Sequence, residues 1–440
     1  MRIRPGTNFV RAILALALFS PLCFFWVHVG WCLLLGLVLI AAISVREYYL
    51  VREMIGMVTI KRDQPAVVGR DIPFSCEITL LNKGVQHING VLRDELPYAA
   101  IPNHRPISVE IIAGGLLTKS TRLRIPERGR YELGPIWLRL LGPWQLVEIQ
   151  QAFDCRAEIK VFPETFVSKE GLSEDQRAQL LMLDKLTRAR HSGAGTEFEC
   201  LSEYRQGDDP RRIDWRTTAR MGHPIVRRYQ VERHRDVIIL IDCGRLMGAS
   251  TGTGSKLDCA IDSALMLTEV VLRYGDRCGI GVFDDRVRGF RTPVSGANSV
   301  RILAECIYNL QTQWRESDFV AMFEELQLRQ SRRSLVVLLS DIVDVETTTR
   351  FRTSLTRLSK KHVLLFAALR TPLLEQVIHS QVSTMLDGLR QVVAFELLKQ
   401  RDQALHLLRH SGIHTLDVKP KELTVPLINE FINLRSQNIL

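Results

Sequence analysis

Two aspartates stand at the ends of apolar runs in the second half of the chain. The runs Asp236–Asp242 and Ser334–Asp341 each close on a carboxylate, Asp242 and Asp341. Continuous apolar runs of this length are typical of strands buried on both faces of a parallel sheet. Ligands of such sheets bind beyond the carboxyl ends of the strands, where two carboxylates can hold a hard cation such as Mg²⁺. The alternative is that each aspartate caps the helix after its strand.

A second concentration of charge lies between Arg205 and Arg235, where nine arginines face four carboxylates. Such a segment can dock an acidic partner or anionic lipid. It can also be an internally paired loop, which we favour because carboxylates and arginines alternate there and Gly-Asp-Asp-Pro-Arg is typical of turns. Nucleic acid is the least favoured partner, since the only interleaved aromatics are Tyr204, Trp215 and Tyr229.

The segment Gly252–Lys256 (Gly-Thr-Gly-Ser-Lys) resembles a phosphate-binding loop in part. A P-loop ends in Gly-Lys-Ser/Thr, whereas Ser255 here separates the last glycine from Lys256. A loop that ends in a helix cap is therefore expected. The sequence contains no G-x-S-x-G or H-E-x-x-H motif.

Strands and helices alternate after residue 236, which predicts a doubly wound, mostly parallel α/β sheet over 236–440. Predicted strands cover 236–242, 278–284, 334–341, 362–369 and 413–418, with a hairpin at 286–292. Predicted helices cover 255–274, 298–312, 317–330, 347–360, 373–411 and 420–436.

Residues 58–165 alternate apolar and polar side chains between turn residues, which predicts a small β-sandwich. The Arg-rich segment 166–235 connects the two parts and contains a predicted helix at Ser173–Arg190. The chain therefore has a multi-domain organisation, with the first 57 residues as a separate anchor.

The anchor is an apolar stretch from Phe9 to Val45 that is too long for one helix across a bilayer. It predicts a transmembrane helical hairpin with spans at about 10–27 and 29–45. Basic residues flank both outer ends and none lies in the turn, so both ends are expected in the cytosol and the protein in the bacterial inner membrane. A cleaved signal peptide is the alternative, but no convincing cleavage site follows the first run.

The nine cysteines are scattered, without a C-x-x-C pair. Scattered thiols fit a reducing compartment and argue against a thiolate metal site.

Several motifs together resemble the bacterial family called domain of unknown function 58. They are Arg128–Pro135 (Arg-Gly-Arg-Tyr-Glu-Leu-Gly-Pro), Gly142–Trp144, Val161–Pro163, and Glu203–Trp215 with Ala219-Arg220. The resemblance implies a von Willebrand A-like C-terminal domain and a MoxR-type AAA+ ATPase as partner. It also implies a signature made of Tyr204, Gly207, Asp208, Pro210, Arg211, Asp214, Trp215 and Arg220.

The resemblance also implies a metal site that can be compared position by position. Von Willebrand A domains hold Mg²⁺ through D-x-S-x-S, a later Thr and a later Asp. Asp242 and Asp341 match the two aspartates and Ser317 (or the adjacent Asp318) the threonine, but the two serine positions hold Gly244 and Leu246. We therefore expect no tightly held Mg²⁺ and no other cofactor, with Arg245 or water in place of the metal.

These observations favour a membrane-anchored interaction module, an adaptor for a MoxR-type ATPase in envelope or complex assembly, and not an enzyme. The alternatives are a metal-dependent enzyme that uses the sheet-edge carboxylates and a structural scaffold of the cell envelope. We also expect Asp214 and Arg211 to hold the signature loop to the α/β domain, and Trp215 to bury its ring.

Overall fold

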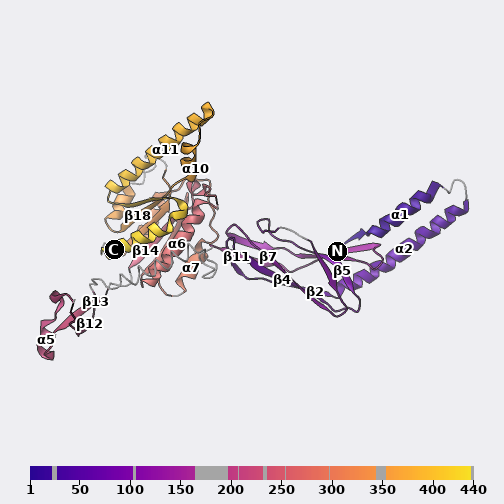
Figure 1. Ribbon diagram of the computed structural model, residues 1–440, viewed down its shortest axis with the longest axis horizontal. Coiled ribbons are helices and arrows are strands. Elements are labelled where there is room, and N and C mark those ends of the chain that lie inside the picture. The colour runs from indigo at the N-terminus through magenta and orange to yellow at the C-terminus, as the bar shows by residue number, and fades with distance from the viewer. Residues whose placement is uncertain are drawn as a thin grey trace. The chain divides into compact units, whose positions relative to one another are not determined.

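The computed structural model describes residues 1–21, 27–102, 106–163, 197–206, 208–230, 235–252, 254–296, 298–342 and 353–437. The chain divides into two compact units, Met1–Phe162 and Pro163–Leu440. Figure 1 shows the elements of each unit. The predicted helix at 173–190 lies outside the described residues.

The first unit begins with a short strand and two apolar helices. Strand β1 (Arg2–Pro5) precedes α1 (Thr7–Phe19), and α2 (Val27–Gly56) lies beside α1 (Figure 1). Among the described helices, only His28–Gly56 is long and apolar enough to span a membrane. Its position near the N-terminus is compatible with a membrane anchor or a signal sequence.

Three sheets complete the first unit. Their orders are β1-β10-β9-β5-β6, β2-β4-β7 and β3-β11-β8. The strands are β2 (Val58–Asp63), β3 (Val67–Gly69), β4 (Phe74–Asn82), β5 (Ile88–Asp94), β6 (Ile107–Ile111), β7 (Leu116–Leu123), β8 (Gly129–Leu133), β9 (Ile136–Leu141), β10 (Val147–Phe153) and β11 (Ala157–Phe162). Alternate residues of strands such as β4, β5 and β9 are buried, because one strand face packs on a hydrophobic core. The sheet β3-β11-β8 contributes to a second hydrophobic cluster.

Helix α2 does not end at residue 45, as the hydrophobic pattern predicted, but continues to Gly56. Its last turns belong to the β core, where Val51, Met54 and Ile55 pack among the strands. Hydropathy alone misses this extension, because one face of these turns is polar and exposed while the other is buried.

A buried carboxylate on α2 holds the turn between β9 and β10. Glu47 is fully buried and accepts hydrogen bonds from the backbone N–H groups of Trp144 (2.8 Å), Leu146 (2.9 Å) and Val147 (3.0 Å). A Cβ at Gly142 would lie 2.1 Å from the Glu47 carboxylate, so only glycine fits at this position. The glycine of the Gly142–Trp144 motif therefore lets the turn close around α2.

Residues 197–230 form a small two-stranded element. Strand β12 (Glu197–Glu203) pairs antiparallel with β13 (Ile225–Gln230), and between them lie the short helix η2 (Pro210–Arg212) and helix α5 (Trp215–Met221). We call this element the signature hairpin, because it contains the residues of the family signature.

The remaining residues form an α/β sheet in the order β16-β15-β14-β17-β18-β19. Its strands are β14 (Asp236–Asp242), β15 (Arg277–Phe283), β16 (Val287–Val294), β17 (Ser334–Ser340), β18 (Val363–Leu369) and β19 (His414–Val418). Only the edge strand β16 is antiparallel to its neighbour. The α-helices described around the sheet are α6 (Lys256–Arg273), α7 (Ser299–Ile307), α8 (Phe319–Arg329), α10 (Pro372–His379), α11 (Met385–His410) and α12 (Thr424–Ser436).

The strand order turns around between β14 and β17. Numbered along the chain it is 3-2-1-4-5-6, the order of doubly wound folds. Helices α8 and α11 pack on one face of the sheet, and α6, which contacts α7 and α12, packs on the other. Ligands of such sheets bind at the carboxyl edge of the two central strands, where Asp242 and Asp341 stand.

Candidate functional site

Asp242 ends β14 and is held by hydroxyls and an amide. Its Oδ1 accepts from the Gly244 backbone N–H (2.8 Å) and from Ser317 Oγ (2.5 Å), and its Oδ2 accepts from Ser340 Oγ (2.5 Å). Only 2% of the residue is exposed. Of the two predicted alternatives for the third ligand position, Ser317 contacts Asp242, whereas Asp318 caps α8.

A serine at position 244 would require the Ser317 hydroxyl to move away from Asp242. A Cβ at this position would lie 2.0 Å from Ser317 Oγ. The Ser317 hydroxyl thus stands where a residue-244 side chain would begin.

Asp341 is held by two cations, and neither is the predicted Arg245. One carboxylate oxygen pairs with Lys256 Nζ and the other with the Arg401 guanidinium. Lys256 is fully buried and Arg401 is 5% exposed. The prediction of Arg245 was wrong: its side chain is 55% exposed and stands 3.8 Å from Glu316.

The same cations continue into a chain of alternating charges. Arg401 also pairs with Asp417 (3.0 Å), which pairs with Arg370 (3.0 Å). Arg370 stands 3.4 Å from Glu375 on α10, and Lys256 Nζ donates to Thr371 Oγ1 (2.6 Å). Because Arg401 belongs to α11 and Thr371 precedes α10, this cluster fixes the base of both helices.

Burial is the main cause of the shifted pKa values of Asp242 and Lys256. Burial raises the pKa of Asp242, against the hydrogen bonds from Ser317 and Ser340, and the charge of Asp341 raises it further. Burial also lowers the pKa of Lys256, while Asp341 works in the opposite direction.

The arrangement does not fit a Mg²⁺ ion. Both oxygens of Asp242 accept from protein donors, and both oxygens of Asp341 pair with cations. Within the described ranges, no group of three or more His, Cys, Asp or Glu side chains converges to hold a metal. An ion here would have to displace Lys256 or Arg401 from a buried pair, which is costly.

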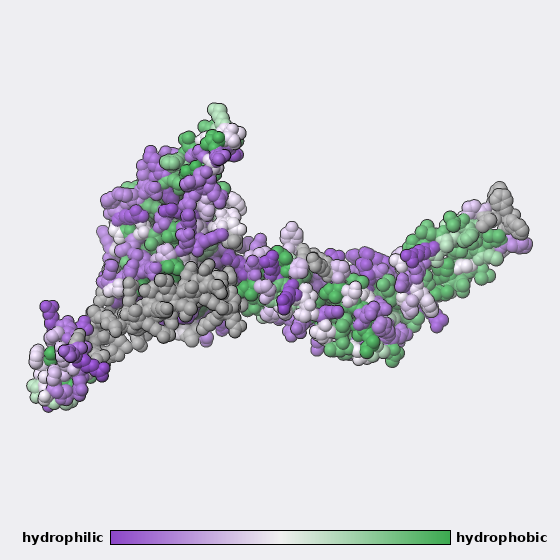
Figure 2. Space-filling model, viewed as in Figure 1, coloured by the Kyte–Doolittle hydropathy of each residue, from purple (hydrophilic) through white to green (hydrophobic). Residues whose placement is uncertain are grey.

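Helices α10 and α11 carry a large exposed apolar face above this cluster. Gln391 fixes the pair by donating to the carbonyls of Val377, Ile378 and Ser380. Eight apolar side chains are more than half exposed: Leu373, Val382, Met385, Leu386, Leu389, Val392, Val393 and Phe395. Figure 2 shows these helices with apolar residues at the surface. Contiguous exposed apolar residues of this number mark interaction sites. We call these residues the α10–α11 face.

The signature hairpin is organised by aspartates that bind backbone. Asp208 accepts from the backbone N–H of Arg205 (2.9 Å) and Asp209 from that of Arg211 (3.0 Å). Asp214 caps α5 and pairs with the Arg227 guanidinium (2.9 Å). The hydrogen bond from the Thr217 backbone N–H lowers the pKa of Asp214 most, and the contacts with Arg227 lower it further. The predicted turn chemistry is confirmed, but these contacts of Asp214 lie inside the hairpin and not on the α/β sheet.

Trp215 does not bury its ring, contrary to the prediction. It is 70% exposed, and Met221 on the same helix is 60% exposed. Asp214 satisfies the helix end, so the tryptophan has no part in closing the turn. Pro210 begins η2, Arg211 and Arg220 are exposed, Tyr204 is partly buried, and Gly207 lies outside the described residues.

The sequence did not identify four residues at this edge of the sheet: Lys256, Arg401, Ser340 and Asp417. Two features of the sequence could have pointed to the two cations. Lys256 occupies the first turn of α6, where a cation opposes the helix dipole and needs a specific partner. Arg401 shares the buried face of α11 with Ala394, Ala404, Leu405 and Leu408.

Residues 201–377 match the family model described as "Protein of unknown function DUF58". Uncharacterized proteins of Mycobacterium bovis and Mycobacterium tuberculosis are 25% identical over 153 residues, 34% of this chain and 48% of theirs. The chain therefore spans about half the length of the curated relatives it matches. The resemblance carried by the Glu203–Trp215 motif is confirmed for this range.

Two solved structures show the extent of structural likeness. Proximal thread matrix protein 1 from the mussel byssus is 8% identical, with a TM-score of 0.28 and 46% of each chain covered. The CARDB domain of a Pyrococcus furiosus protein is 14% identical, with a TM-score of 0.17 over 24% of this chain and 86% of that chain. Scores of this size carry no argument about fold or function.

Proposed function

We propose that this protein is a membrane-anchored docking protein that binds a partner through the α10–α11 face of a von Willebrand A-like domain. The exposed apolar face is the observation that carries the proposal. Its stripe of Met385, Leu389, Val392 and Val393 recurs at helical spacing, so the side chains share one side of α11. A partner that covers this stripe would remove a large apolar area from water.

The charged cluster supports this role, because it makes the face rigid. Asp341, Lys256 and Arg401 lock the base of α11, and Thr371 locks the start of α10. A docking surface held in one geometry loses less conformational entropy on binding. In this proposal the edge that could hold a metal in a von Willebrand A domain has become a structural support.

Contacts of the chain before α1 and at the end of α2 support an anchor that is not cleaved. Strand β1 pairs with β10, with Arg2 opposite Gln150 and Pro5 opposite Val147. If α2 crosses a membrane, the chain before it must cross as well, since β1 pairs with β10 and the last turns of α2 pack in the β core of the same unit. Cleavage of a signal peptide would remove an integral strand. The positive-inside rule then favours a cytosolic location.

The partner we propose is a MoxR-type AAA+ ATPase, as the family resemblance implies. The signature hairpin supplies a second candidate surface, because exposed Trp215 and Met221 stand among arginines. Tryptophan and arginine are enriched at the energetic centres of protein interfaces. The engaged carboxylates of Asp242 and Asp341 argue against the metal-dependent enzyme.

The binding proposal is tested by Leu389→Glu, with Leu328→Glu as the matched control. Leu389 lies on the α10–α11 face and Leu328 is an 81% exposed leucine of α8. The full chain is captured from mild detergent with the purified ATPase, with and without nucleotide. We expect Leu389→Glu to weaken capture by about tenfold or more, as loss of an interface centre does, and Leu328→Glu to leave it unchanged. Equal capture of all three proteins would contradict the proposal.

The topology is tested separately by a reporter. Alkaline phosphatase, which is active only in the periplasm, is fused after Leu440. We expect no activity and full-length protein in the membrane fraction. Strong activity would overturn the cytosolic orientation and leave the binding test unaffected.

A further inference from the structure

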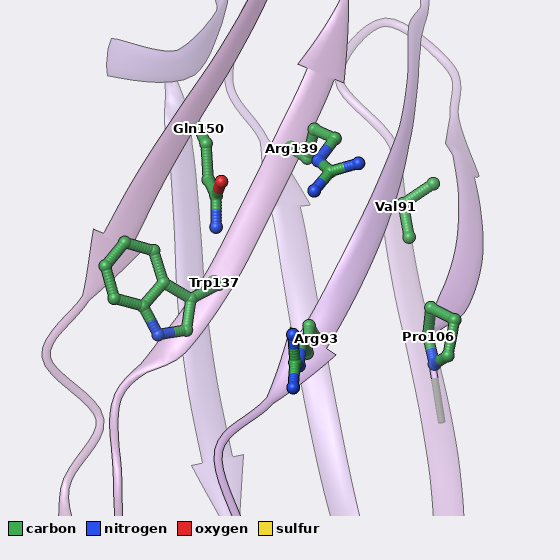
Figure 3. Close-up of a pocket in the computed structure, with 6 residues that line it drawn as sticks. All are labelled: Val91, Arg93, Pro106, Trp137, Arg139 and Gln150. Carbon is green, nitrogen blue, oxygen red and sulfur yellow. The ribbon is translucent and has the colours of Figure 1, made fainter. Parts of the chain in front are cut away.

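The outer face of the sheet β1-β10-β9-β5-β6 carries a basic cavity. The inward residues of this sheet, such as Leu138 and Ile149, belong to the hydrophobic core, so the alternate residues face outward. The cavity measures about 340 Å³ and is lined by Val91, Arg93, Pro106, Trp137, Arg139 and Gln150. Figure 3 shows the arginine and tryptophan side chains around this space, from β5 and β9, with Gln150 from β10.

Strand register extends the basic character across the face. Arg139 lies opposite Gln150, which lies opposite Arg2, and Arg4 lies opposite Glu148. Directly opposite residues in antiparallel strands share a face. The outward positions of these five strands therefore hold four arginines and two glutamates: Arg2, Arg4, Arg93, Arg139, Glu110 and Glu148.

Two groups in the cavity have unused hydrogen-bonding capacity. Arg93 is exposed and forms no ion pair with any residue that the structure describes. Gln150 Oε1 is buried and accepts no hydrogen bond in the same part of the chain. By contrast, Arg139 pairs with Glu148 (2.6 Å) and the Trp137 indole donates to Glu95 (3.0 Å). A ligand that fits must offer an anion to arginine and a donor to the glutamine oxygen.

The position of the sheet identifies the source of that ligand. Pro5 ends β1 and Thr7 begins α1, so this face starts at the apolar helices. The row of Gln150 and Arg139 lies three residues from the row of Pro5, about 10 Å at the rise of a strand. Arg46 stands over the Trp144 ring (5.9 Å) beside this edge, an arrangement typical of the boundary of a bilayer.

We propose that this face binds the headgroup of an anionic phospholipid that carries a free hydroxyl, of the phosphatidylglycerol type. Arg93 and Arg139 donate to the phosphate oxygens, and a headgroup hydroxyl donates to Gln150 Oε1. Arg2 and Arg4 attract the same leaflet from the edge strand. This inference rests on the proposed membrane anchor.

The test measures lipid binding by native mass spectrometry of the full chain in mild detergent. Phosphatidylglycerol and phosphatidylcholine with identical acyl chains are titrated in parallel, and glycerol 3-phosphate is the soluble competitor. We expect phosphatidylglycerol to bind about tenfold more tightly, and Arg93→Gln to remove most of this preference. Arg122→Gln, which removes an exposed arginine from β7, should leave the preference intact.

Each other outcome overturns the inference. Equal binding of the two lipids excludes a headgroup site. If Arg93→Gln and Arg122→Gln lose the preference for phosphatidylglycerol equally, the preference comes from net charge and not from a specific site. Displacement by glycerol 3-phosphate at equal concentration would make the ligand a soluble phosphate ester. Carbonate extraction of cell membranes tests the anchor independently: a chain released into the soluble fraction contradicts the anchor, whatever the titration shows.

Discussion

Two buried carboxylates, one in each unit, lock a helix onto a sheet by different means. Glu47 holds α2 to the β9–β10 turn through three backbone N–H groups. Asp341 holds α11 through the guanidinium of Arg401 and the ammonium of Lys256. The first attachment depends on the path of the backbone, and the second on the identity of two side chains.

This difference decides how each attachment fails. Removing Asp341 leaves the Lys256 ammonium buried without its counter-charge and Arg401 with Asp417 alone, a penalty larger than the worth of the pairs themselves. Removing the Glu47 carboxylate leaves neutral amide groups, each of which loses one hydrogen bond. Four substitutions test this difference and the sheet edge around Asp341.

Asp341→Ala should destabilise the protein most. We expect a loss of about 3–5 kcal/mol in the free energy of unfolding, because Lys256 and Arg401 remain buried after their shared carboxylate is gone. Urea unfolding of the full chain in detergent measures it. The triple variant Asp341→Leu, Lys256→Met, Arg401→Leu should recover most of the loss. If the triple variant is as unstable as Asp341→Ala, stranded charge is not the cause.

Glu47→Gln should have a smaller effect. The glutamine amide still accepts from one or two backbone donors but presents its own NH₂ to the others, for a loss of about 2 kcal/mol. Glu53→Gln, an exposed glutamate on the same helix, is the control and should change nothing. Thermal unfolding of the two variants compares them. Equal melting temperatures would show that the turn holds without the carboxylate.

Asp242→Asn should change how the free energy of unfolding depends on pH. The folded state raises the pKa of Asp242, so it favours the protonated form, and the stability from this group is greatest below the ordinary pKa of 3.8. Between that value and the raised pKa, stability falls as pH rises, by up to about 1.4 kcal/mol per pH unit for a single proton. Asp242→Asn should lack this dependence when urea unfolding is followed across pH. Parallel pH profiles for wild type and variant would show that Asp242 ionises normally.

Arg245→Ala should change stability least, by less than about 0.5 kcal/mol, because its contact with Glu316 is long and exposed. The measurement is the same urea titration. A loss comparable to that of Asp341→Ala would restore Arg245 as the cation of the sheet edge and undo the comparison.

Much of the α/β sheet could be predicted from the sequence, because its central strands are continuous apolar runs. Asp242 and Asp341 were placed at one edge for the same reason, since parallel strands end together, whereas Ser317 came only from the family resemblance. The partners of Asp341 could not be inferred. Lys256 and Arg401 are 145 residues apart, and only tertiary packing brings both to one carboxylate.

Two residues show further limits of prediction from sequence patterns: Glu47 on α2 and Trp215 in the signature hairpin. Glu47 follows an arginine at the end of an apolar span, where it is expected to be solvated, yet a distant turn folds around it. Trp215 was expected inside because tryptophan is large and apolar. Its ring is 70% exposed, while the neighbouring Asp214 caps the helix.

The pairing of β1 with β10 imposes an order on biosynthesis. Arg2 leaves the ribosome before its partner Gln150, which follows nearly 150 residues later. Domains fold as they emerge, N-terminal parts first, and long-range pairing comes late. In the proposed membrane topology, the two apolar helices therefore reach the bilayer before β1 can pair with β10. Until β10 is synthesised, the four residues of β1 present an unpaired strand edge, which is the kind of edge that can pair with another chain.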